Sequence, residues 1–234
     1  MSTTAVTAAT VETTKPRLEN AGIVSLCLFV GSLQLSIAVS AVFLTVSLGL
    51  WIAILMSHGE RLELPDIFWS LLVYAGFTLV SVAASLDPIT SLIDSKELLL
   101  FLVVPLVYRL GRGRSAHTIA SIIISVGAVT AVVGIIQYGI LEFDSLGQRP
   151  LGSMGHYMTY SGLLMLVIGL ATARLLFGTS DRLWAGLVLP TLLVALALTL
   201  TRSAWVGTCI GVGLLFVIRD RRLLAAVPVI VAIF

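Results

Sequence analysis

Residues 21–56 contain no charged side chain, and this stretch limits the possible folds of the chain more than any other feature of its sequence. As one helix it would be about 50 Å long at about 1.5 Å per residue. The hydrocarbon core of a bilayer is only about 30 Å thick. Two shorter helices, residues 21–37 and 40–56, fit that thickness better. We therefore expect an apolar helical hairpin with a turn near residues 36–40.

The rest of the chain continues this pattern of apolar segments joined by short polar ones. The 234 residues are 58% hydrophobic and 11% charged, whereas soluble domains carry about 25% charged residues. This composition excludes a water-soluble core. The predicted fold class is all-α, a polytopic bundle of about eight complete transmembrane spans of about 20 residues each. After the opening hairpin, the expected spans are residues 66–85, 96–110, 116–139, 157–177, 183–201 and 203–218.

The two ends of the sequence differ from this pattern. Residues 1–20 are rich in Thr and Ala and lack an apolar face, which is typical of a disordered tail. Residues 21–234 would form the transmembrane domain. A ninth span begins near Leu223 but has only about 12 apolar residues of the roughly 20 that a span needs. We therefore expect the sequence to be the N-terminal part of a longer protein.

Lys and Arg are distributed unevenly between the two predicted sides of the membrane. With a cytoplasmic N-terminus, only Lys96, Arg149 and Arg202 of the 14 Lys and Arg fall on the outer side. Cytoplasmic loops carry the excess of basic residues in membrane proteins, so the sequence favours this orientation. Membrane lipids are the expected surroundings, and no nucleic-acid partner is expected. The sequence shows no metal-ligand spacing and no cofactor motif.

Arg202 interrupts an otherwise uncharged segment from Leu183 to Ile218. A charge at bilayer depth costs roughly 2.5–3.5 kcal/mol on insertion scales, so such a residue indicates function. The alternative is an arginine in an outer turn that extends to the interface. If Arg202 were embedded in the membrane, Glu142 and Asp144 would be its nearest acidic partners in the predicted topology.

The outer segment 149–157 contains Arg149, two glycines, Gly152 and Gly155, and His156 just before a helix. Free backbone N–H groups and a helix N-terminus favour an anion such as phosphate. The alternative is a solvated loop whose glycines only form turns. Two arginines at one membrane face can bind a pyrophosphate through paired hydrogen bonds. The predicted pyrophosphate-binding residues are Arg149, Arg202, His156 and Ser203.

A further outer segment, residues 85–97, has charged residues with a predicted structural role. Asp87-Pro88 indicates a turn or helix end. Asp94 is predicted to be the N-cap of the next helix, with Glu97 at the third helical position. These side chains are therefore expected to cap a helix.

Taken together, four features resemble the O-antigen ligase and O-antigen polymerase-like superfamily of bacterial inner-membrane glycosyltransferases. The order of these features extends over nearly the whole chain. They are the opening apolar hairpin, the segment from Ser85-Leu86-Asp87-Pro88 to Ser91-Leu92, the stretch with Arg149, Gly152, His156 and Tyr160-Ser161-Gly162, and the segment Thr201-Arg202-Ser203-Ala204-Trp205.

The resemblance implies a reaction on the periplasmic side. Members transfer a glycan from undecaprenyl pyrophosphate to lipid A core, if ligases, or to another glycan, if polymerases. The implied mechanism is inverting, metal-independent and of the GT-C type, and Arg149 and Arg202 would hold the pyrophosphate. Family enzymes also carry a large periplasmic loop with a proposed catalytic histidine, which this sequence does not contain. His156 does not match that histidine, so the catalytic residues are unknown.

Two other classes of protein are compatible with the sequence. One is a transporter of a small anion such as bicarbonate. Transporters place ionisable residues or broken helices near the membrane midplane, whereas Pro190 is the only interior helix breaker in this sequence and no acid lies mid-span. The other class is a non-catalytic membrane scaffold.

Overall fold

The computed structural model is helical and describes residues 3–59, 62–143, 148–178 and 182–219. The all-α class is thereby confirmed for these residues, and five of the helices are long and apolar enough to cross a membrane, in agreement with the predicted membrane character. The predicted count of eight spans and the cytoplasmic N-terminus stay predictions. The helices are α1 (Thr3–Ser32), α2 (Ile37–His58), α3 (Asp66–Ala83), α4 (Pro88–Asp94), α5 (Val103–Leu110), α6 (Arg114–Gly139), α7 (Tyr157–Phe177), α8 (Arg182–Leu198) and α9 (Arg202–Arg219), with the 3-10 helix η1 (Ser95–Leu102) between α4 and α5.

The first apolar stretch forms two helices, as expected. The turn between them occupies residues 33–36, slightly before the predicted position, and the amides of Leu35 and Ser36 both donate to the carbonyl of Ser32. α1 begins at Thr3 and so continues through the segment predicted to be a tail. The disorder expected for that tail stays a prediction. The ninth span, predicted from Leu223 onward, lies outside the described residues.

Contacts within the chain divide it into two compact units, and each is described by itself. The first unit is Met1–Phe29 with Ala41–His117, and the second is Val30–Ser40 with Thr118–Phe234.

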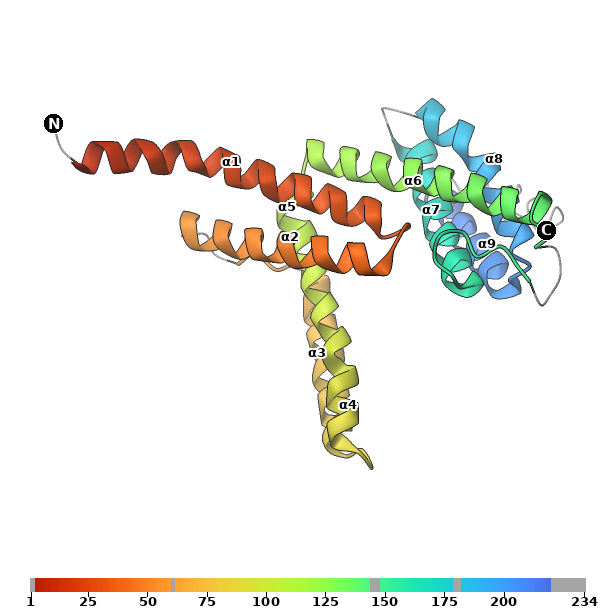
Figure 1. The fold of residues 1–234 in the computed structure, drawn as a ribbon, viewed down its shortest axis with the longest axis horizontal. Coiled ribbons are helices and arrows are strands. Elements are labelled where there is room, and N and C mark those ends of the chain that lie inside the picture. The colour runs from red at the N-terminus through yellow and green to blue at the C-terminus, as the bar shows by residue number, and fades with distance from the viewer. Residues whose placement is uncertain (1–2, 60–61, 144–147, 179–181, 220–234) are drawn as a thin grey trace. The chain divides into compact units, whose positions relative to one another are not determined.

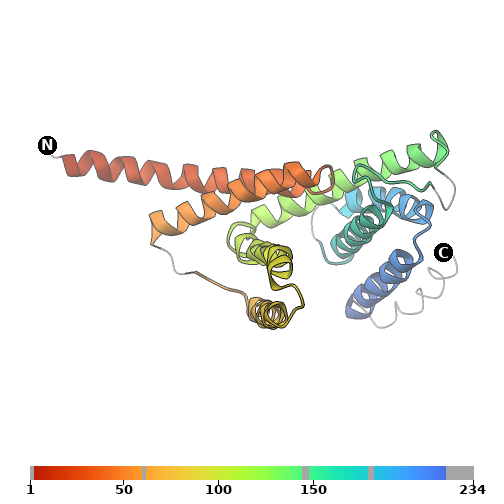
Figure 2. The same cartoon turned by 60° about the horizontal axis from the view of Figure 1, so that its bottom comes forward.

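In the first unit, α1 and α2 lie side by side as an antiparallel pair (Figures 1 and 2). The buried hydroxyls of Ser25 and Ser47 hydrogen bond between the two helices at 2.9 Å. The absence of a side chain at Gly22 lets Ile54 of α2 and Leu110 of α5 approach α1 closely. An ion pair between Glu19 and Arg109, at 3.1 Å, also joins α1 to α5. Small and polar residues therefore bring these apolar helices together, as is common in membrane proteins.

The first unit also contains a second hairpin, formed by α3 and by the continuous rod α4–η1–α5 (Figure 1). The rod begins at Pro88, which is eight residues before the predicted span. Its N-cap is Asp87, whose Oδ1 accepts from the Thr90 amide at 3.2 Å and whose Oδ2 accepts from the Thr90 hydroxyl at 2.6 Å. Asp94 makes no capping hydrogen bond. The capping role predicted for Asp94 and Glu97 is therefore wrong, because the helix has already begun when the chain reaches them.

In the second unit, α7 packs against both α8 and α9 (Figure 2). Its buried face carries Leu164, Ile168 and Ala171 into a core shared with residues of α6, α8 and α9. The largest of the fully buried side chains is Tyr160, whose hydroxyl donates to the carbonyl of Thr130 in α6 at 2.9 Å. Gly134 faces the Tyr160 ring, and a Cβ at that position would clash with the phenol. The close approach of α6 and α7 thus depends on this glycine.

The asparagine variant of Asp87 provides a pH-dependent test of the α4 cap. In the wild-type protein, the hydrogen bonds that Asp87 accepts from Thr90 hold the pKa of its carboxyl below the ordinary value of 3.8. A lowered folded-state pKa gives stability that is complete above the ordinary value and is lost as the pH falls through the lowered one. We expect the Thr90 amide to exchange faster with solvent deuterium in Asp87→Asn than in wild type at neutral pH. This difference in exchange rate should shrink as the pH falls below the lowered pKa of Asp87. A difference that stays constant with pH would contradict the assignment of Asp87 as the cap of α4.

The contact between Gly134 and Tyr160 provides a test of the packing in the second unit. We expect Gly134→Ala to lower the free energy of unfolding by about 1–3 kcal/mol, because the added methyl group overpacks a filled site. Thermal unfolding of detergent-purified protein measures the change. Gly139→Ala is the matched control at the end of the same helix, where a Cβ meets nothing within 4 Å. Equal melting temperatures for the two variants would refute the packing described here.

Candidate anion-binding site

His156 and Tyr157 form the start of α7. His156 is the N-cap, with Nδ1 accepting from the amide of Met158 at 3.3 Å. Its ring stacks on Tyr157, with 5.0 Å between ring centroids and 17° between planes. While Nδ1 accepts this bond, Nε2–H is the donor that the exposed ring offers. The position of His156 in the sequence predicted a ligand contact, and the structure adds a capping role.

Arg149 also contacts the start of α7. Its guanidinium carbon is 4.7 Å from the centroid of the Tyr157 ring, within the range of a cation–π contact. Nη1 donates to the carbonyl of Leu200 at 3.5 Å, which is a long hydrogen bond. Among the described residues, its buried Nε has no hydrogen-bond partner. A buried donor without an acceptor costs free energy.

Arg149 contacts the turn between α8 and α9. Leu200 has a left-handed backbone with φ of 53°, which is costly for a branched side chain. Hydrogen bonds on both sides maintain the turn. The Thr199 hydroxyl donates to the carbonyl of Leu196 at 2.7 Å, and Nε1 of Trp205 donates to the same carbonyl at 3.1 Å. The Thr201 hydroxyl donates back to the carbonyl of Thr199 at 3.2 Å, so the turn itself uses this hydroxyl.

Arg202 and Ser203 are the first two residues of α9, and both are exposed. Arg149 contacts Leu200, which precedes Arg202 by two residues in the sequence. Within the part of the chain that the structure describes, neither arginine forms an ion pair with a carboxylate. Glu142 is exposed and is not such a partner, and Asp144 lies outside the described residues. Arg149 therefore contacts residues next to the N-terminal ends of both α7 and α9, and each helix end carries a positive partial charge.

Sequence reasoning missed the residue that holds this region in place, Gln137 at the end of α6. Its side-chain oxygen accepts from the amides of Leu151 and Gly152, both at 2.9 Å, and its nitrogen donates to the carbonyl of Gly152 at 2.8 Å. Gly152 has φ of 58° and lies against the Tyr160 ring, where a side chain would clash. A polar residue near the end of an apolar helix was the only signal of this role in the sequence.

A second glutamine, Gln34, contacts the next residue of the loop. The Ser153 hydroxyl donates to the backbone carbonyl of Gln34, and the Gln34 side chain donates to the carbonyl of Ile123 at 2.9 Å. The turn after α1 therefore lies beside the 149–156 loop within the second unit. The predicted topology also places these two segments on the same side of the membrane.

Comparisons with known proteins gave no match, whether to a family model, a curated protein or a solved structure. The resemblance to O-antigen ligase-like proteins therefore depends on the motif residues alone. Of the predicted site residues, the structure brings Arg149 close to the turn that precedes Arg202 and Ser203, and His156 close to Tyr157 beneath Arg149. Their binding of a pyrophosphate stays a prediction.

Replacing Gln137 with methionine tests how the loop is held. Gln137→Met removes three hydrogen bonds and leaves the amides of Leu151 and Gly152 without acceptors. We expect a loss of about 1–3 kcal/mol in the free energy of unfolding, together with faster hydrogen exchange at those two amides. Tyr138→Phe, which removes a polar atom from the next position, is the control. If both amides exchange as slowly in Gln137→Met as in Tyr138→Phe, Gln137 does not hold the loop.

Proposed function

We propose that the chain is part of a bacterial inner-membrane glycosyltransferase of the O-antigen ligase type. It would bind an undecaprenyl-pyrophosphate-linked glycan at the periplasmic side, for transfer to lipid A core or to a further glycan. The observation that carries the proposal is Arg149, whose buried Nε has no hydrogen-bond partner among the described residues and which lies beside the turn that leads to Arg202. The motif resemblance supplies the reaction, and this cationic region supports the carrier-binding step.

The arrangement is suited to a pyrophosphate at a membrane surface. A guanidinium offers two parallel donors to a phosphate, and the first amides of α9 have no acceptor within their own helix. The exposed Ser203 hydroxyl adds another donor at the same helix start.

Leaving-group stabilisation is the role that fixed cations can perform in this reaction. When the glycosidic bond breaks, negative charge grows on the departing pyrophosphate, and cations already in position stabilise it. The Tyr157 ring holds one of these cations, Arg149, at a fixed site. In a polymerase the same residues would act on the same carrier, since only the acceptor differs.

Binding of the carrier tests the proposal. We expect Arg149→Ala and Arg202→Ala each to weaken binding of undecaprenyl pyrophosphate to nanodisc-embedded protein by at least tenfold, because each removes a charge-assisted contact. Arg149→Lys should restore only part of the affinity, since lysine keeps the charge without the paired donors. The control is Arg182→Gln, which removes an exposed arginine at the start of α8.

Two results would count against this function. One is equal carrier affinity in wild type, Arg149→Ala and Arg202→Ala. The other is a flux of bicarbonate across liposomes containing the protein, which would instead support the transporter alternative.

A further inference from the structure

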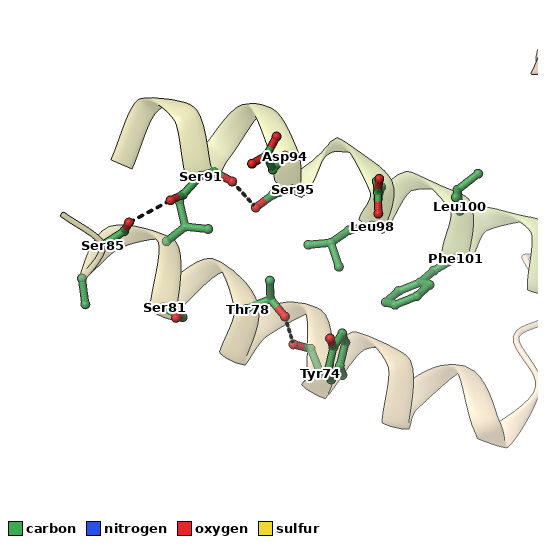
Figure 3. A pocket seen from close by; sticks show the side chains of 13 residues that line it. Tyr74, Thr78, Ser81, Ser85, Ser91, Asp94, Ser95, Leu98, Leu100 and Phe101 are labelled. Atoms are coloured by element: carbon green, nitrogen blue, oxygen red, sulfur yellow. Dashed lines mark hydrogen bonds between the residues drawn. The ribbon is translucent and has the colours of Figure 1, made fainter. Parts of the chain in front are cut away.

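We infer that the groove between α3 and the α4–η1 rod is a binding site for a saccharide. The inference stands on this groove alone and does not depend on the proposed carrier site. The groove has a volume of about 740 Å³, within the roughly 300–1,000 Å³ typical of ligand sites. Figure 3 shows it between the two helices.

Small polar residues form the floor of the groove toward the turn of the hairpin. On α3 and just after it, Thr78 and Ser85 are half-buried, and Ser91 and Ser95 are half-buried on the rod. Ser85 and Ser91 hydrogen bond to each other across the groove at 2.8 Å (Figure 3). Ser91 and Ser95, four residues apart, lie on one face of the rod, and Thr78 and Ser85 are seven residues apart along α3 and the turn after it. This face would suit close helix packing, yet a groove remains between the helices.

The other end of the groove is apolar and aromatic. Phe101 and Leu98 point from the rod toward α3, and Tyr74 lies opposite them (Figure 3). The rings of Tyr74 and Phe101 are 6.1 Å apart with an interplanar angle of 57°. The two tilted rings each present an apolar face, and the Tyr74 hydroxyl adds one polar edge.

Two carboxylates, Asp94 and Glu97, complete the lining. Both are exposed, so they form the edge of the groove. Asp94 caps no helix, and within the described residues neither carboxylate has a hydrogen-bond or ion-pair partner. Thr78 and Ser81, which lie across the groove, belong to a helix apolar enough to span a membrane. Asp94 and Glu97 belong to the predicted outer segment 85–97, so both carboxylates are free to accept hydrogen bonds from a ligand in the groove.

A saccharide matches this combination better than other ligands do. Its hydroxyls donate to carboxylates and exchange hydrogen bonds with serine and threonine, and its C–H face packs on aromatic rings. A lipid chain would leave the carboxylates and hydroxyls without partners. A hydrated cation would gain nothing from the wall formed by Tyr74, Leu98 and Phe101. A helix from a second copy would have to place basic residues against both carboxylates.

The first experiment measures saccharide binding directly. Labelled protein in nanodiscs is tested against an array of bacterial polysaccharide fragments and neutral oligosaccharides. We expect binding that the double variant Asp94→Asn, Glu97→Gln weakens at least tenfold and that Tyr74→Ala also weakens. Phe77→Ala and Lys96→Gln are the matched controls, because these exposed neighbours do not line the groove. Melting temperatures equal to that of wild type show that the variants are folded.

The second experiment locates the bound saccharide. In a background in which Cys27 and Cys209 are replaced by serine, Ser95→Cys should react with a water-soluble maleimide. The saccharide that binds best in the array should slow this reaction at least threefold. Arg149→Ala should leave saccharide binding unchanged, and Asp94→Asn should leave carrier binding unchanged. Failure of this inference is thereby distinguishable from failure of the proposed function.

Five results would overturn the inference, and the first four concern binding and labelling. They are no saccharide bound at millimolar concentration, equal binding by the double variant, an unreactive cysteine at position 95, and a disulfide-linked dimer of Ser95→Cys, which would place a second copy in the groove. Displacement of a bound divalent cation as the only effect of the carboxylate substitutions would likewise exclude a saccharide site.

Discussion

The hydrogen-bonding requirement of the backbone governs this structure, because hydrocarbon offers no partners for free N–H and C=O groups. Helices meet the requirement within themselves, but the loop before α7 does not. The Gln137 side chain accepts two hydrogen bonds from that loop and donates one to it. The backbone carbonyl of Gln34 accepts a hydrogen bond from Ser153 in the same loop. The position of Arg149 depends on this support, since Arg149 stands only two residues before the loop amides that Gln137 binds.

Tyr160 connects the packing of the helices to the loop. Its ring lies against Gly134 of α6 and Gly152 of the loop, and its hydroxyl bonds to Thr130. The same side chain therefore sets the distance between α6 and α7 and the course of the chain toward the arginine. Packing and the candidate site are coupled through one residue of the α7 core.

The sequence predicted what depends on composition and local spacing. The split of residues 21–56 into two helices and the helices around residues 116–139 and 157–177 followed from apolar length and segment order. The cap was misassigned because two Asp residues, Asp87 and Asp94, both precede apolar segments and only the position of Pro88 separates them. The contacts of Gln137 and the groove beside Asp94 depend on tertiary geometry, which periodicity does not contain.

The left-handed backbone of Leu200 has a thermodynamic consequence. Its carbonyl accepts from Arg149, so the guanidinium helps to stabilise a conformation that leucine alone disfavours. An anion that draws Arg149 toward itself would weaken this contact and shift the turn toward ordinary backbone geometry. Binding of an anion would then change the backbone conformation of the turn between α8 and α9. By the same linkage, a change in that turn would alter the affinity for the anion. The start of α9 would thus report whether the cationic region is occupied.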